Sequence, residues 1–212
     1  TNDANNYMTS MDAKVVVVGD MTQQEVMPKL TFLNKLPKKK ITLPKVNATP
    51  AVDKTKVYLV DVPKGAQTEF RVGYATGLKY DATGDYYKAG LANYALGGDF
   101  NSRLNLNLRE DKGWTYGASS KFGADEYSGD FEFSSGIRAN ATDSALSEVM
   151  RELKNYTQNG ITDEELAFMK SAIGQRDALR YETGAQKAAF IRRILDYNLP
   201  ANYVDQQNKI LK

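Results

Sequence analysis

An arginine and a tyrosine seven residues apart, Arg109 and Tyr116, are the side chains best suited to chemistry in this sequence. Both lie in the stretch Gly97–Gly117, which reads GGDFNSRLNLNLREDKGWTYG. A guanidinium and a phenol both donate hydrogen bonds near neutral pH, and the guanidinium stays charged. The two residues flank an expected turn between a helix and a strand, so their side chains could converge on one point. The pair is therefore a candidate for binding a carbonyl or anionic group.

Two simpler interpretations of the same residues remain open. Arg109 could form a surface ion pair with a neighbouring acid, Glu110 or Asp111. Tyr116 could be one more aromatic side chain on its strand, beside Trp114. Residue types and spacing alone do not separate these interpretations from a functional site.

The sequence contains no histidine and no cysteine. Without histidine the chain lacks the commonest general base and the commonest zinc ligand, and without cysteine it has no thiol nucleophile. A Ser-His-Asp triad or a histidine-based zinc site cannot be built from this chain alone. Three carboxylates, Asp99, Asp125 and Glu126, lack the spacing of a calcium-binding loop, so we predict no metal site.

Composition favours an ordinary globular protein and excludes several classes of partner. The chain has 212 residues, of which 42% are hydrophobic and 25% charged, and its net charge is +2. This charge is too small to indicate a nucleic-acid partner, and the basic run Pro37–Lys40 reads as a solvated linker. No apolar run approaches the roughly 20 residues that cross a membrane, so we expect no membrane segment in this chain.

The first 50 residues predict a strand, a helix and a linker. Lys14–Asp20 (KVVVVGD) has the β-branched run of a strand buried on both faces. Thr22 and Glu25 form a capping-box pattern for a helix that reaches about Asn34. Residues 36–50 contain three prolines and three consecutive lysines, which predicts an extended linker and a domain boundary near residue 50.

The next elements lead into the candidate site. Lys56–Asp61 and Gln67–Thr76 read as strands joined by a turn, and a helix should run from about Asp81 to Leu96. Gly97 and Gly98 stop that helix, either as a plain C-terminal cap or as part of a substrate-facing loop. A second helix is expected over Phe100–Glu110. Its apolar stripe is predicted to consist of Phe100, Leu104 and Leu108. Ser102, Asn105 and Arg109 are expected on the opposite face.

Two strands follow the second helix. The first should carry one face of alternating residues, namely Trp114, Tyr116, Ala118, Ser120 and Phe122. The second spans Tyr127–Ile137, with Phe131, Phe133 and Ile137 on one face. A helix is then predicted after Thr142, ending at Asn159–Gly160, and further helices from a capping box at Thr162–Glu165, over about 184–197 and over 201–211. We expect an α+β fold, a largely antiparallel sheet covered by helices.

Several segments, in the right order, resemble one protein family. LGGDFNSRLNLNLREDKGWTYGASS, preceded by QTEFRVGY, is similar to the second homologous half of insulysin/pitrilysin-type zinc peptidases, which include the mitochondrial processing peptidases. The end of the chain, YETGAQKAAFIRRILDYNLPANYVDQQNKIL, resembles the same half further along, so the likeness covers about residues 50–212. VVVVGDMTQQEV resembles the strand and helix that close the preceding half.

This resemblance implies a fold, a partner and a set of site residues. In the family, two related halves close around an unfolded peptide, and the first half holds zinc through an H-x-x-E-H motif. The second half supplies an arginine and a tyrosine spaced like Arg109 and Tyr116, which reach the bound substrate. A glycine-rich substrate-recognition loop of the processing peptidases matches GGDF weakly. It implies candidate substrate contacts at Gly97, Gly98, Phe100 and Asn101.

The resemblance leaves two hypotheses. The chain is either the substrate-binding, transition-state-assisting half of a zinc metalloendopeptidase or an inactive half that binds peptides or serves as a structural subunit. It would hold no cofactor itself, and zinc would lie in the homologous half, on the same polypeptide or a separate subunit. Residues 51–212 form the second-half domain, which we expect to lack its own final strand and helix. Lys14–Asn34 would then fill the vacant sheet position or pair with a second molecule.

Overall fold

The computed structural model describes residues 6–11, 13–42, 45–46, 52–178 and 180–212. The chain divides into two compact units. Unit 1 comprises Thr1–Asn47 and Arg176–Ala201, and unit 2 comprises Ala48–Gln175 and Asn202–Lys212. The candidate site residues all lie in unit 2.

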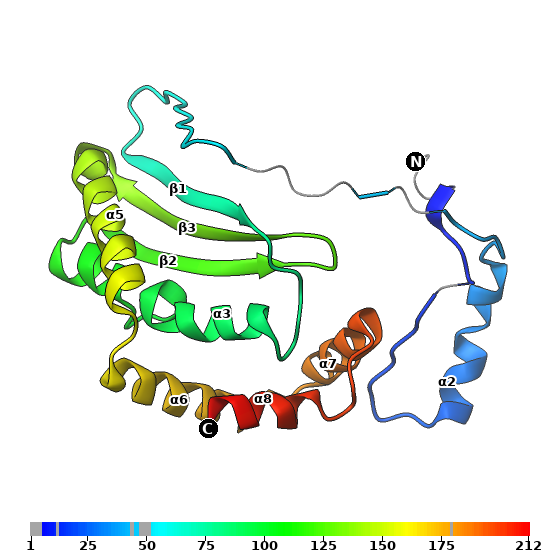
Figure 1. Cartoon of the computed structure of the whole chain (residues 1–212). Coiled ribbons are helices and arrows are strands. Elements are labelled where there is room, and N and C mark those ends of the chain that lie inside the picture. The colour runs from blue at the N-terminus through cyan, green and yellow to red at the C-terminus, as the bar shows by residue number, and fades with distance from the viewer. Residues whose placement is uncertain (1–5, 12, 43–44, 47–51, 179) are drawn as a thin grey trace. The chain divides into compact units, whose positions relative to one another are not determined.

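Unit 2 is built on a three-stranded antiparallel sheet (Figure 1). Its strands are β1 (Gln67–Thr76), β2 (Thr115–Ala124) and β3 (Gly129–Arg138), in the order β1-β3-β2. β1 has the bounds that its alternating sequence predicts. The sheet and its helices confirm the predicted α+β fold.

Helices and helical turns make up the rest of unit 2. A helix, α3 (Asp85–Asn93), continues into a π-helical turn, η2 (Tyr94–Gly98). The short helix α4 (Arg103–Asn105) likewise continues into a π-helical turn, η3 (Leu106–Asp111). After β3 come a 3₁₀ turn, η4 (Ala139–Ala141), and the helices α5 (Thr142–Asn159), α6 (Asp163–Ala178) and α8 (Tyr203–Leu211).

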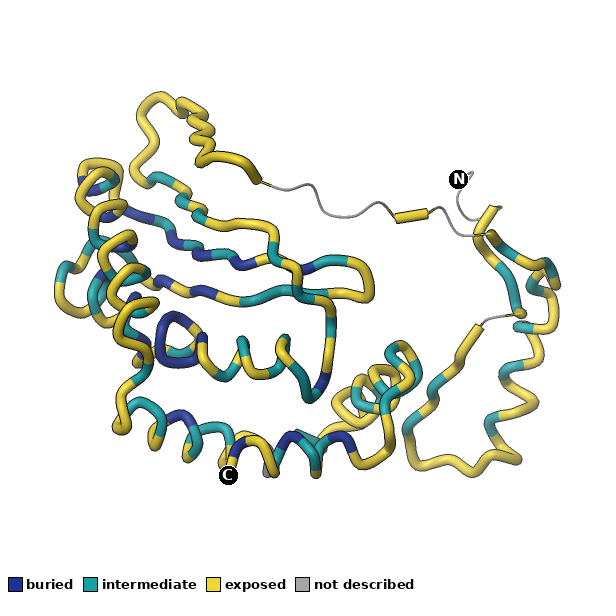
Figure 2. Tube along the Cα trace, viewed as in Figure 1, coloured by how far each residue is buried: buried dark blue, intermediate teal, exposed yellow. Residues whose placement is uncertain are grey.

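The main core lies on one face of the sheet. Phe131, Phe133 and Ile137 point to this face of β3, where burial alternates along the strand as predicted (Figure 2). They pack against Leu104, Leu108, Ala145 and Val149 from α4, η3 and α5. A smaller cluster joins Tyr94, Met169 and Leu211, and so connects η2 with α6 and α8. The helices therefore cover the face of the sheet that carries Phe131, Phe133 and Ile137.

Unit 1 contains α2 (Gln23–Lys29), a 3₁₀ turn η1 (Thr31–Lys35) and α7 (Gly184–Tyr197). Reciprocal capping boxes open both helices, as Thr22 predicts for α2. The ammonium group of Lys14 donates a hydrogen bond to the carbonyl oxygen of Leu195 in α7. This hydrogen bond links the segment before α2 to α7.

Two predicted strands are wrong. Lys14–Asp20 has no strand structure, and Val15 and Val17 are 52% and 51% exposed rather than buried. Lys56–Asp61 is likewise irregular, and its Val57–Val60 side chains are all more than four-fifths exposed. Valine-rich runs favour a strand only where a neighbouring strand supplies backbone partners. Neither run joins the sheet of the described residues, so Lys14–Asn34 does not fill a sheet position.

The predicted linker over residues 36–50 is only partly described, and the domain boundary near residue 50 stays a prediction. Residues 36–42 and 45–46 are in neither a helix nor a strand, and the rest of 36–50 lies outside the described residues. Within the described ranges of the chain, no helix is both long and apolar enough to cross a membrane.

The helix predicted over Phe100–Glu110 begins only at Arg103 and ends as a π-helical turn. Phe100 therefore lies before the helix and is 57% exposed, whereas Leu104 and Leu108 are fully buried as predicted. Ser102 and Asn105, expected on the far side, are 1% and 3% exposed. The prediction assumed one regular helix, while the late start and the wider turn change which residues face the core.

Candidate functional site

A short joint connects η3 to β2 and fixes the backbone between Arg109 and Tyr116. The Trp114 amide donates to the Leu108 carbonyl oxygen at 2.9 Å, and the Gly113 amide donates to the Arg109 carbonyl oxygen at 3.0 Å. Gly113 has a φ of 62°, a left-handed conformation that glycine adopts without a steric penalty. Arg109 and Tyr116 therefore lie on the two sides of one hydrogen-bonded turn.

The side chain of Arg109 is held by two neighbours. Its guanidinium carbon lies 4.3 Å from the ring centroid of Phe100, in cation–π geometry. Its Nη1 is 3.5 Å from a carboxylate oxygen of Glu110, which is the surface ion pair that the sequence also allowed. The structure thus brings Arg109 and Phe100 together as a cationic and aromatic pair.

Strict alternation along the strand predicts that Tyr116 shares a face with Ala118 and Ser120. This prediction is wrong. A β-bulge separates Thr115 from Ala118, and Tyr116 is 90% exposed while Ala118 and Ser120 are buried. A bulge inserts one residue into a strand and redirects its side chains. Because Tyr116 is so exposed, its phenol is available to a molecule outside this chain.

The buried side chain of Asn105 connects the backbone at Phe100 with β2. Its Oδ1 accepts a hydrogen bond from the Ala118 amide at 3.0 Å, and its Nδ2 donates to the Phe100 carbonyl oxygen at 2.7 Å. The same side chain therefore fixes the backbone before α4 and the strand after the bulge. The Ala118 partner lies on the following strand, thirteen residues away, so no spacing around Asn105 marks this role in the sequence.

A second buried asparagine, Asn93, ties α3 to the middle of β2. Its Nδ2 donates to the Ser120 carbonyl oxygen at 2.7 Å, and its Oδ1 accepts from the Ser120 hydroxyl at 2.6 Å. Asn93 and Asn105 together occupy backbone groups on the edge of β2 that β3 does not use. The two asparagines therefore fix the part of β2 that directly follows Tyr116.

The four predicted substrate contacts lie in different environments. Gly97 is buried, and a Cβ there would lie 2.2 Å from the Ser120 hydroxyl oxygen. Gly98 and Asn101 are exposed. Phe100 is also exposed, and its ring contacts the Arg109 guanidinium. The observed role of Gly97 is close packing, and substrate contact at all four positions stays a prediction.

Zinc does not fit the residues of this chain. Structural and catalytic zinc sites use cysteine, histidine and carboxylate ligands, and the sequence has neither of the first two. In the part of the chain that the structure describes, no three acidic side chains are grouped so that they could hold a metal ion. The side chains of the candidate site contribute hydrogen-bond donors and a positive charge.

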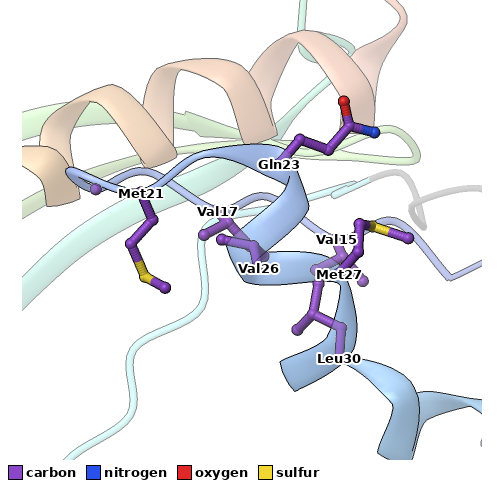
Figure 3. A pocket seen from close by; sticks show the side chains of 8 residues that line it. Val15, Val17, Met21, Gln23, Val26, Met27 and Leu30 are labelled. Atoms are coloured by element: carbon purple, nitrogen blue, oxygen red, sulfur yellow. The ribbon is translucent and has the colours of Figure 1, made fainter.

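A second surface feature lies in unit 1. An apolar hollow of about 390 Å³ lies between the segment before α2 and α2 itself (Figure 3). Val15, Val17, Met21 and Met27 line it, and each is about half exposed. Exposed apolar side chains gathered in one place are typical of a surface that contacts another protein segment.

Comparisons with known proteins address the family directly. A family model described as the peptidase M16 inactive domain matches residues 4–173. No curated protein sequence matches the chain at a significant level.

Three solved structures are similar to most of this chain. The peptidase M16 inactive domain from Pseudomonas fluorescens is 26% identical, with a TM-score of 0.74 over 90% of this chain and 44% of that one. A protease from Helicobacter pylori is 19% identical, with a TM-score of 0.77 over 92% of this chain and 47% of that one. The periplasmic protease PqqL from Escherichia coli is 17% identical, with a TM-score of 0.57 over 91% of this chain and 21% of that one. This chain spans less than half of each, and the last two show the fold alone.

Proposed function

We propose that this chain, which belongs to the peptidase M16 inactive-domain family, is the substrate-side half of a zinc metalloendopeptidase that acts on extended peptides. Zinc would be held by the homologous half, on the same polypeptide or on a separate subunit. Arg109 and Tyr116 would contact the bound peptide, and this chain alone would be inactive.

The observation that carries the proposal is the exposure of Tyr116, which follows Arg109 by seven residues and which a bulge turns away from the core. A tyrosine that serves only packing buries most of its ring, whereas Tyr116 is 90% exposed. Its phenol and the Arg109 guanidinium stand on either side of one turn, on a backbone fixed by Leu108 and Trp114.

Both side chains can stabilise a peptide undergoing cleavage. Negative charge develops on the carbonyl oxygen of the scissile bond, and fixed hydrogen-bond donors lower the energy of that state. In this proposal Tyr116 donates to that oxygen, and Arg109 holds the peptide backbone or adds positive charge. The Phe100 ring limits the freedom of the guanidinium and so keeps it ready for this contact.

The homologous half is the expected protein partner. The apolar hollow lined by Val15, Val17 and Met27 would lie at the end of that half, because this segment resembles the strand and helix that close it. Gly97, Gly98, Phe100 and Asn101 remain candidate substrate contacts, and of these the Phe100 ring contacts Arg109.

Kinetics on the intact protein, with its zinc-bearing half, test the proposal. Tyr116→Phe and Arg109→Ala should each lower kcat/KM by about 10²–10³, the usual effect of removing one such donor. Tyr127→Phe is a matched control, because Tyr127 is also exposed but lies at the β2–β3 hairpin. The proposal fails if both site variants stay within a few-fold of the parent.

A second candidate function is a catalytically inactive half that binds peptides or serves as a structural subunit. The contact of Arg109 with Glu110 favours it, because an ion pair partly occupies the guanidinium. A search for H-x-x-E-H upstream in the reading frame, or in a co-encoded neighbour, separates the two. Absence of the motif from both would favour the inactive half.

A further inference from the structure

The strand register defines where Tyr116 would point if β2 were regular. Ala118 pairs with Ser135, and Thr115 pairs with Ile137. Three steps along β2 therefore match two steps along β3, so one extra residue lies in β2. Counting back from Ala118 without that residue would place Tyr116 opposite Ile137, whose side chain is fully buried on the helix-covered face.

Two hydroxyl groups bind the backbone of the bulge. The Ser135 hydroxyl donates to the Gly117 carbonyl oxygen at 2.8 Å, and the Thr115 hydroxyl donates to the Gly136 carbonyl oxygen at 2.8 Å. The Gly117 amide donates back to the Thr115 hydroxyl oxygen at 3.0 Å. The two hydroxyl oxygens themselves are 2.9 Å apart. Together they bind the amide and the carbonyl of Gly117, at the point where the register of the ladder shifts.

Glycine itself does not explain the bulge. Among the described glycines only Gly113 and Gly160 have a positive φ, so Gly117 adopts a conformation open to other residues. A Cβ on Gly117 would meet only the Asn105 Oδ1 atom, at 4.0 Å. The hydroxyl groups of Thr115 and Ser135 are thus the specific feature that holds the extra residue in place.

We infer that Thr115 and Ser135 are positioning residues, which hold the bulge at Tyr116–Gly117 and thereby direct the Tyr116 phenol outward to the substrate. The part of this inference that concerns substrate rests on the proposed function. The part that concerns the orientation of Tyr116 does not, and each can be tested separately.

Hydroxyl-radical footprinting of the full chain, read at single residues by mass spectrometry, tests the orientation. Thr115→Val keeps the branched shape but removes the hydroxyl, and Ser135→Ala removes the second one. In the double variant the oxidation rate of Tyr116 should fall at least twofold, whereas Thr115→Ser should retain the parent rate. Ser119→Ala is the matched control, because its hydroxyl lies on the same strand and only approaches Ser134, at 3.5 Å.

An unchanged Tyr116 rate in the folded double variant would overturn the inference. If the double variant does not fold, Ser135→Ala alone is compared with Ser119→Ala at the same residue, and equal rates would overturn it as well. Gly117→Ala should leave the rate unchanged, since the position has room for a methyl group.

Activity of the intact protein tests the link to substrate. Thr115→Val should lower kcat about tenfold with KM changed less than twofold, and Thr115→Ser should restore kcat. If Tyr116→Phe and Arg109→Ala both leave kcat/KM within a few-fold of the parent, the proposed function fails while the footprinting result still stands. If Tyr116→Phe lowers kcat/KM but the footprint and kcat of Thr115→Val match the parent, the positioning inference alone fails.

Discussion

Arg103 and Glu165 form a two-point ion pair between α4 and the first turn of α6. Nε and Nη2 of the arginine each lie 2.6 Å from a different carboxylate oxygen, and the side chains are 21% and 26% exposed. Glu165 also accepts the Thr162 amide at 2.8 Å, so one carboxylate caps α6 and binds α4. The guanidinium lies 4.9 Å from the Tyr156 ring centroid, which extends the contact to α5. The helix that leads to Arg109 is anchored through this pair.

Removal of the Arg103 side chain should destabilise unit 2. Arg103→Ala leaves a partly buried carboxylate without its cationic partner, and we expect the free energy of unfolding to fall by about 2 kcal/mol. Arg103→Lys should recover only part of this loss, because an ammonium group cannot form the parallel pair of hydrogen bonds. Urea unfolding followed by the fluorescence of Trp114, the sole tryptophan, reports on the main core that it packs against.

Lys121→Ala provides the control for this experiment. Lys121 lies 3.6 Å from Glu132, but the two side chains are 69% and 38% exposed. Exposed pairs of this kind contribute about 0–1 kcal/mol, so the variant should unfold close to the parent. Equal losses in Arg103→Ala and Lys121→Ala would contradict a specific role for the pair between α4 and α6.

The same pair predicts an acid dependence of stability. The hydrogen bond from Arg103 lowers the pKa of Glu165 below its ordinary value, and burial opposes this shift. Since the folded-state pKa is lowered, the unfolded state binds the proton first as pH falls. The stability that Glu165 contributes is present above about pH 4.3 and is lost as pH falls through the lowered pKa.

Glu165→Gln tests this dependence because glutamine keeps the cap but carries no charge. Unfolding free energies of parent and variant, measured between pH 6 and pH 3, should differ most at pH 6 and converge toward pH 3. Curves that stay parallel over this range would show that ionisation of Glu165 does not contribute to stability.

A methyl group at Gly97 should disturb the contact between η2 and β2. The Cβ of Gly97→Ala would lie 2.5 Å from the Ser120 amide nitrogen, which is backbone and cannot rotate away. Overpacking of this kind costs about 1–3 kcal/mol, so the thermal unfolding midpoint should fall by several degrees. Gly90→Ala is the control, because nothing lies within 4 Å of a Cβ there and alanine favours helix α3. A matching loss in both variants would contradict close packing as the role of Gly97.

Local patterns predicted most elements of the fold. The bounds of β1, α5 and α7 agree with the sequence, because alternation, helical periodicity and a terminal glycine or proline lie within each segment. The helical spacing of Leu146, Val149, Met150 and Leu153 predicts one buried face for α5, and the structure agrees only in part. Leu146 and Met150 are 41% and 51% exposed, and Ala145 and Val149 carry the contact with the sheet.

The geometry of the candidate site could not be predicted in the same way. The outward orientation of Tyr116 depends on hydroxyl groups at Thr115 and Ser135, and Ser135 lies on the neighbouring strand. The burial of Asn105 depends on Ala118, thirteen residues away. The family resemblance selected Arg109 and Tyr116, but their placement required the register between β2 and β3.

The buried amide of Asn105 gives a last prediction, in which a substitution creates a pH response. Asn105→Asp keeps an acceptor for the Ala118 amide but replaces the donor to the Phe100 carbonyl oxygen with a second oxygen. A carboxylate that is 3% exposed and faces a carbonyl oxygen has a raised pKa, because burial and repulsion both disfavour its charge. The folded variant then binds a proton more readily than the unfolded one, so its stability rises as pH falls through the raised pKa. The free energy of unfolding of Asn105→Asp should be lower than that of the parent by about 2–4 kcal/mol at pH 8, and this loss should shrink toward pH 5. The exposed Asn155→Asp should show neither effect, and a pH-independent loss in Asn105→Asp would contradict the hydrogen bond to Phe100.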